Sequence, residues 1–136
     1  MKTIRTMLGS AIVAAAVLLS GCQAADPLEG TSWQLLAYGE SIPIAGTTIT
    51  AHFQEGQIRG SGGCNSYSAT YRLAGSRIEI DELAWTVMAC IDPAGVNEQE
   101  SLVMRLLHEA QTYRVVDGQL QILPADGQAL TFVPAH

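Results

Sequence analysis

Short segments in which apolar and polar residues alternate, separated by turn residues, make up most of the chain from Thr31 onward. A period of two predicts strands that bury one face and expose the other. Asp117-Gly118 and Asp126-Gly127 separate the last three segments and predict hairpins, because Asp-Gly tolerates the positive φ angles of a type I′ turn. The predicted strands cover residues 33–38, 49–53, 57–59, 67–73, 78–80, 83–88, 113–116, 120–123 and 130–133.

One segment follows the helical period instead. Asn97 and Glu100 predict a capping box at its start, with Glu98 and Glu100 on the surface. A single amphipathic helix must bury its apolar stripe against the strands. We therefore predict a mainly β (α+β) domain, an antiparallel curled sheet or small β-barrel-like domain of about eight or nine strands with one amphipathic α-helix. The stripe consists of Leu102, Val103, Leu106, Leu107 and Ala110.

The N-terminus has the character of an export signal. Lys2 and Arg5 precede an apolar run over 7–19, which is too short to cross roughly 30 Å of hydrocarbon as a helix. The run ends in Leu18-Leu19-Ser20-Gly21-Cys22, which resembles a bacterial lipoprotein signal. The resemblance implies removal of residues 1–21, acylation of Cys22 and attachment to the membrane through this lipid. A plain secretory signal with an incidental cysteine is the alternative.

The lipoprotein hypothesis sets the expected organisation and location. Residues 22–29 are predicted as a short tether and residues 30–136 as the domain. Gln23, rather than an aspartate, follows the cysteine, which favours sorting to the outer membrane. We therefore expect a lipid-anchored protein of the bacterial cell envelope, on the outer membrane and facing the periplasm.

The charge of the mature chain limits its partners. Residues 22–136 contain five arginines, no lysine and thirteen acidic residues, a net charge of −8. Nucleic acids require a basic face that neutralises phosphates, so no nucleic-acid partner is expected. The same charge balance argues against electrostatic attachment to anionic lipid.

Two cysteines remain after Cys22 is assigned to lipid. An even pair in an oxidising compartment favours a disulfide between Cys64 and Cys90. The loop that it closes holds about 27 residues, for which the chain-entropy model gives about 3.6 kcal/mol of stabilisation. Gly60 to Gly63 come directly before Cys64 and allow close backbone approach.

The residues around these cysteines resemble the META/HslJ domain. The resemblance rests on 62–71 (GGCNSYSATY), 86–90 (TVMAC), 98–100 (EQE) and 30–33 (GTSW), and it extends over about 30–133. Ala69 stands where a glycine is common, and Val87 stands where a basic residue is common. Membership implies a compact β-barrel-like fold with a helix, a lipoprotein signal and a link to heat shock and envelope stress. It implies no enzymatic activity.

Three kinds of chemistry are considered: a cysteine nucleophile, a redox cysteine pair and a metal site. His52 or His108 could activate Cys64 or Cys90 as a nucleophile, although a disulfide and ordinary histidines explain the same residues. The cysteines lack the Cys-x-x-Cys spacing of redox pairs, and the histidines lack zinc-site spacing. We expect no metal and no cofactor.

Aromatic and polar residues near Cys64 suggest a binding face. Asn65, Tyr67 and Tyr71 could line it, although strand tyrosines more often pack across strands. Trp85 and Met88 are predicted in the core.

The sequence favours a non-enzymatic envelope lipoprotein with a META/HslJ-like domain, a stress-related module that binds another envelope protein. A carrier of small apolar ligands and a thiol-dependent enzyme using Cys64 are the alternatives. An apolar cavity of several hundred Å³ in the folded domain would favour the carrier.

Overall fold

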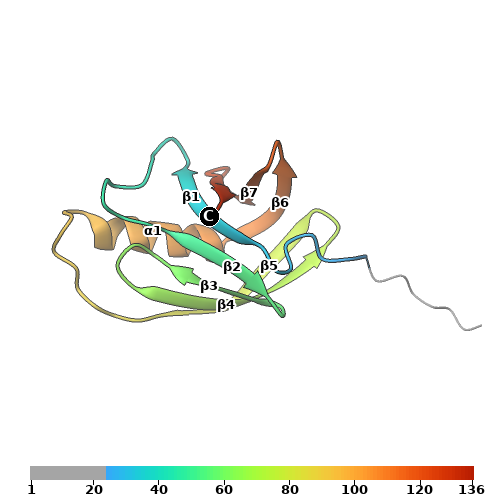
Figure 1. Ribbon diagram of the computed structural model, residues 1–136, viewed down its shortest axis with the longest axis horizontal. Helices are drawn as coiled ribbons and strands as arrows, with labels where there is room; N and C mark the ends of the chain where they lie inside the picture. Colours follow the sequence, from blue (N-terminus) through green and yellow to red (C-terminus); the bar gives the residue numbers. More distant parts are fainter. Residues whose placement is uncertain (1–23) are drawn as a thin grey trace, which may run out of the picture.

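The computed structural model of the protein describes residues 24–136, so the predicted signal peptide and Cys22 lie outside the described residues. Eight strands form a closed antiparallel barrel in sequential order, in which β8 pairs with β1 (Figure 1). This confirms the predicted fold class. The elements are β1 (Ser32–Tyr38), β2 (Thr50–Gln54), β3 (Gln57–Ser61), β4 (Ser66–Ala74), β5 (Arg77–Trp85), α1 (Val96–His108), β6 (Ala110–Val116), β7 (Gln119–Pro124) and β8 (Leu130–Pro134).

Alternating side chains fill the barrel interior. Along β4, for example, Tyr67, Ala69 and Tyr71 are buried while the residues between them are more exposed. Phe53 meets Tyr71 edge to face, with ring centroids 5.0 Å apart. Other side chains that are fully buried in the same core are Ile49, Ile58, Leu106, Leu120, Ile122, Leu130 and Phe132.

The helix lies where two neighbouring strands separate. β5 and β6 pair at Arg77 and Thr112, and β6 begins only at Ala110, directly after the helix. Helix α1 contacts β5, β7 and β8 and turns a buried stripe that includes Val103, Met104 and Leu107 toward the core. The predicted helix therefore packs against the barrel wall.

The sequence predicted two strands, over 78–80 and 83–88, where the structure has the single strand β5, so this prediction was wrong. Asp81-Glu82 does not reverse the chain, and one strand runs from Arg77 to Trp85. Glu82 has a φ of 51°, and the pairing register with β4 shifts between Ser68 and Thr70. The irregularity is a bulge, which accommodates an extra residue without ending the strand. The barrel therefore has eight strands, and the predicted strand over 83–88 ends at Trp85.

The folded domain starts earlier than Gly30. Leu28 is fully buried in the core, although the sequence placed it in the tether. The backbone N–H of Leu28 donates to Asp26 Oδ1 at 2.8 Å, and the Tyr71 hydroxyl donates to Asp26 Oδ2 at 2.6 Å. These contacts fix the N-terminal turn to the barrel.

Within residues 24–136, no helix is both long and apolar enough to cross a membrane.

Candidate functional site

A Gly-rich corner between β3 and β4 forms the centre of the site. The structure confirms the disulfide between Cys64 and Cys90, whose Cα atoms lie 6.0 Å apart. The chain turns tightly here, because the Gly62 N–H donates to the Asn65 carbonyl at 2.7 Å. Gly63 has a φ of +107°, a conformation that side chains rarely adopt. The bridge thus joins this corner to the segment that leads into α1.

Glu100 holds the corner from the helix. Its Oε2 accepts the backbone N–H groups of Cys64 at 3.1 Å and Asn65 at 2.6 Å, and its Oε1 accepts Asn65 Nδ2 at 2.6 Å. Glu100 is only 4% exposed. A Cβ added to Gly62 would lie 2.5 Å from Glu100 Oε2, so the glycine makes room for this carboxylate.

The predicted capping box was therefore wrong. The helix begins at Val96 after Gly95, which has a left-handed conformation and provides no side-chain cap. Asn97 and Glu100 are both inside the helix, and their side chains bind other segments of the chain instead of the helix start. Tertiary partners compete successfully with the local capping bonds, and Glu100 is buried rather than on the surface as predicted.

Asn65 extends the contact from the helix to the segment after β5. Its Oδ1 accepts the Met88 N–H at 2.7 Å and the Thr86 hydroxyl at 2.9 Å. Its Nδ2 group donates to the Met88 carbonyl at 3.2 Å as well as to Glu100. A buried side chain with this many partners has a single favourable orientation. Asn65 therefore fixes the backbone of 86–88.

Two further side chains of the first helical turn hold adjacent loops. Asn97 Nδ2 donates to the Cys90 carbonyl at 2.6 Å, and its Oδ1 accepts the Cys90 N–H at 3.3 Å. The buried Gln99 accepts the Ile44 N–H at 2.7 Å and donates to Thr47 Oγ1 at 3.1 Å. The start of α1 is thus a hub to which three separate loops are attached.

The segment held in this way exposes apolar side chains. Val87 and Ile91 are each 93% exposed, Met88 is 59% exposed and Trp85 is 44% exposed. The prediction that Trp85 and Met88 belong to the core was wrong. Trp85 is the last residue of β5, and Met88 lies beyond the strand, where the alternation no longer determines which side chains face the core.

The cysteines are paired with each other and not with histidines. His52 lies in β2, where its ring hydrogen-bonds with Ser32 Oγ at 2.7 Å and with Gln54 Oε1 at 3.2 Å. His108 is the last residue of α1, whereas Cys90 precedes the helix. Across residues 24–136 there is also no group of three or more His, Cys, Asp or Glu side chains that could hold a metal ion.

The proposed binding face over Asn65, Tyr67 and Tyr71 stays a prediction, but all three side chains are buried. The Tyr67 hydroxyl donates to the Thr50 carbonyl at 2.8 Å. Burial raises the pKa of Tyr67 well above its ordinary value of 10.0. Burial also raises the pKa of Tyr71, with further contributions from Asp26 and Glu29. These positions favour the packing interpretation.

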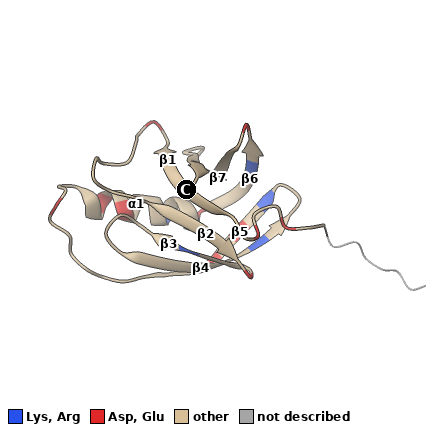
Figure 2. Cartoon of the chain, in the orientation of Figure 1, with Lys and Arg blue, Asp and Glu red and all other residues tan. Residues whose placement is uncertain are grey.

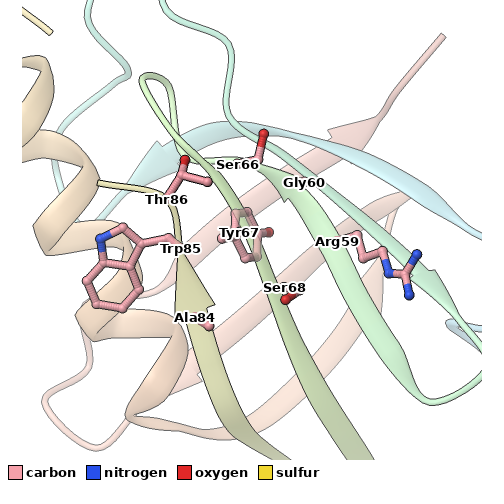
Figure 3. Close-up of a pocket in the computed structure, with 8 residues that line it drawn as sticks. All are labelled: Arg59, Gly60, Ser66, Tyr67, Ser68, Ala84, Trp85 and Thr86. Atoms are coloured by element: carbon pink, nitrogen blue, oxygen red, sulfur yellow. The ribbon is translucent and has the colours of Figure 1, made fainter. Parts of the chain in front are cut away.

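An open hollow of about 550 Å³ lies on the outside of β3, β4 and β5 (Figure 3). Arg59 and Trp85 stand at its two sides, and Trp85 points toward the helix rather than over the hollow. Most of the remaining lining is small, with Gly60, Ser68 and Ala84. The hollow is therefore open and shallow in its side chains, and the barrel interior is occupied by core side chains.

Glu100 and Gln99 are the site residues whose roles the sequence reasoning missed. A signal for Glu100 was available, because it lies three and four residues before the buried Val103 and Met104. Its helical phase therefore places it on the buried stripe, where a carboxylate needs hydrogen-bond partners.

The META domain family matches residues 26–136. An NMR structure of a protein from Burkholderia xenovorans is 25% identical, with 94% of this chain and 99% of that chain covered and a TM-score of 0.69. A second NMR structure is also 25% identical, covers 79% and 91% of the two chains and gives a TM-score of 0.65.

A crystal structure of a DUF4847 family protein from Bacteroides vulgatus shares the fold at 12% identity. It covers 79% of this chain and 94% of its own, with a TM-score of 0.55. None of the curated proteins matches the chain. The descriptions of the three structures name no activity, ligand or partner, so the comparisons give no sign of catalysis.

Proposed function

Because this chain belongs to the META domain family, we propose that it is a non-enzymatic recognition module of a bacterial cell envelope that binds another envelope protein. One observation carries the proposal. The two cysteines of the domain are joined in a disulfide and core side chains fill the barrel, so recognition falls to the outer surface. The family resemblance adds an expected role under heat or envelope stress.

The anchor in this proposal is lipid on Cys22. Only residues 23–25 separate this cysteine from Asp26, which is hydrogen-bonded to the barrel. The four Cα-to-Cα steps from Cys22 to Asp26 span at most about 14 Å, so the anchored domain stays close to its bilayer. The acyl chains of a lipoprotein cysteine are sufficient for stable attachment without a basic surface.

The filled interior counts against the carrier of small apolar ligands. Fully buried residues from several strands, among them Phe53, Ile122 and Phe132, meet in one core. The thiol-dependent enzyme would need Cys64 as a free thiolate, whereas Cys64 is bonded to Cys90.

The anchor is tested by membrane fractionation of the full chain expressed in a bacterium with an outer membrane. We expect the wild type in the outer-membrane fraction and Cys22→Ala outside it. Gln23→Asp is the matched control, because it keeps the lipid site and should move the protein to the inner membrane. Cofractionation of Cys22→Ala with the outer membrane would refute the lipid anchor.

The non-enzymatic part is tested with an electrophilic thiol probe on the native, non-reduced protein. We expect no labelling of Cys64 or Cys90, because neither carries a free thiol. Stoichiometric labelling of Cys64 together with turnover of a thioester substrate would refute the proposal and favour the enzyme.

A further inference from the structure

The exposed apolar side chains of the described domain are concentrated in one place. Eight large hydrophobic residues are exposed, and four of them lie in the seven-residue segment Trp85–Ile91. The other four, Leu36, Ile42, Val115 and Val116, are distributed over β1, the loop after it and β6. Scattered exposed hydrophobic residues are normal, whereas a local concentration marks interaction surfaces.

Trp85–Ile91, which we call the 85–91 segment, is exposed, but its backbone is fixed by several hydrogen bonds and by the disulfide. Asn65 binds both backbone polar groups of Met88, the disulfide fixes Cys90, and Asn97 binds both backbone polar groups of Cys90. Glu100, in turn, holds Asn65 from the helix. A surface that is ordered before binding loses less conformational entropy when a partner docks. Val87 and Ile91 are thus presented to solvent from a fixed backbone.

The charged residues that follow the 85–91 segment in the sequence are acidic, and the basic Arg59 lies on the far side of the hollow beside Trp85. Asp92 and Glu98 are exposed next to it, and residues 86–98 contain no lysine or arginine. In Figure 2 the segment that leads into α1 carries acidic residues and no basic ones. The helix arginine, Arg105, lies further along and pairs with Glu109 at 2.8 Å and Asp126 at 3.6 Å. A complementary partner therefore has basic residues beside its apolar ones.

The position of the 85–91 segment favours a protein, rather than the lipid bilayer, as its binding partner. In Figure 1 the first described residues enter at the right, whereas the segment leading into the start of α1 lies at the left. A domain attached through Cys22 therefore directs this segment away from the membrane that holds the lipid. The acidic surroundings also oppose contact with anionic lipid head groups.

We infer that the 85–91 segment is the docking surface of the domain, and that its occupant is a protein segment with apolar side chains flanked by Lys or Arg. The inference rests on the proposed binding function and adds its location and the chemistry of its partner.

The test is photo-crosslinking of the anchored full chain in its own envelope, with p-benzoylphenylalanine replacing Val87, Ile91 or Val116 in turn. Val116 is the matched control, because it is a valine that is 48% exposed on β6. We expect Val87 and Ile91, but not Val116, to crosslink the same protein. Mass spectrometry should map the crosslink to a segment in which Lys or Arg flanks apolar residues.

Charge variants test the second half of the inference. With the photoreactive residue at position 91, Val87→Asp should lower the crosslink yield at least tenfold, and Val116→Asp should not change it. Asp92→Lys and Glu98→Lys should each lower the yield several-fold. Urea unfolding of each variant identifies any loss that comes from misfolding.

Each crosslinking result that differs from the expected one would overturn a specific part of the inference. Crosslinks to phospholipid from Val87 and Ile91 would replace the protein partner with a lipid surface. Crosslinks to a protein from Val116 alone would refute the docking surface and leave the proposed binding function standing. Crosslinks from none of the three positions would refute both the docking surface and the proposed binding function. A higher yield from Asp92→Lys would refute the basic partner.

Discussion

Replacing Glu100 with glutamine tests whether the start of α1 stabilises the Gly-rich corner. The substitution keeps the shape of the side chain and changes one carboxylate oxygen into an NH₂ group. Oε2 accepts two backbone N–H groups and Oε1 accepts Asn65 Nδ2. The single carbonyl oxygen of a glutamine can accept the donors at one of these two positions, and its NH₂ group then faces a donor at the other.

The expected loss follows from the number of donors. One buried donor left without an acceptor costs about 1–3 kcal/mol. The remaining bonds lose their charge assistance, which is worth roughly half of their strength, or about 0.5–1 kcal/mol for the pair. We predict that Glu100→Gln lowers the free energy of unfolding by about 1.5–4 kcal/mol. This is a large share of the roughly 5–15 kcal/mol typical of small domains.

The assay is urea unfolding followed by tryptophan fluorescence, with Glu98→Gln as the control. Glu98 belongs to the same helical turn but is exposed, so its substitution should cost only about 0.3–1 kcal/mol through the helix dipole. Native-state hydrogen exchange should also show faster exchange of the Cys64 and Asn65 amides in Glu100→Gln. A loss for Glu100→Gln no larger than that for Glu98→Gln would refute the role of this carboxylate.

Three further predictions concern the same domain. Replacing Cys64 and Cys90 together by alanine should lower the free energy of unfolding by about 3.6 kcal/mol in urea titrations, and an unchanged midpoint would contradict the chain-entropy account. Gly62→Ala should cost about 1–3 kcal/mol in the same assay, because its Cβ would lie 2.5 Å from the carboxylate it faces; a neutral effect would show that the carboxylate moves freely. The raised pKa of Tyr71 means that the folded state keeps its proton longer than the unfolded state does, so its contribution is complete below about pH 10 and is lost above. Tyr71→Phe should therefore reduce the fall in stability above pH 10 by up to about 1.4 kcal/mol per pH unit, measured by thermal unfolding, and an unchanged slope would contradict the shift.

The strands and hairpins of the barrel were predictable because their signals are local. Asp117 and Gly118 both have positive φ, at 51° and 75°, as the type I′ turn requires. The hairpin between β7 and β8 also forms, but its loop is longer and Asp126 accepts the Gln128 N–H. A bulge such as that at Glu82 is not visible in the pattern, because a bulge and a turn use similar residues.

The disulfide was predictable from the cysteine count and the expected oxidising compartment, whereas the network around it was not. A local pattern suggested that Glu100 caps its own helix, but its partners are in a corner 35 residues away along the chain. Hydrophobicity likewise suggested a buried Met88, although Asn65 fixes the backbone there with the side chain outward. Both errors arose from contacts between residues that are distant in sequence.

If Cys22 carries lipid as proposed, the burial of Leu28 shortens the tether between the anchor and the domain. The sequence placed eight residues, 22–29, in the tether, and the turn that starts at Asp26 makes the last four of them part of the domain. A lipid on Cys22 would then hold Asp26 within about 14 Å of the anchor. Force applied through such an anchor would reach the core at Leu28, and a truncated domain that begins at Gly30 would lose this buried side chain.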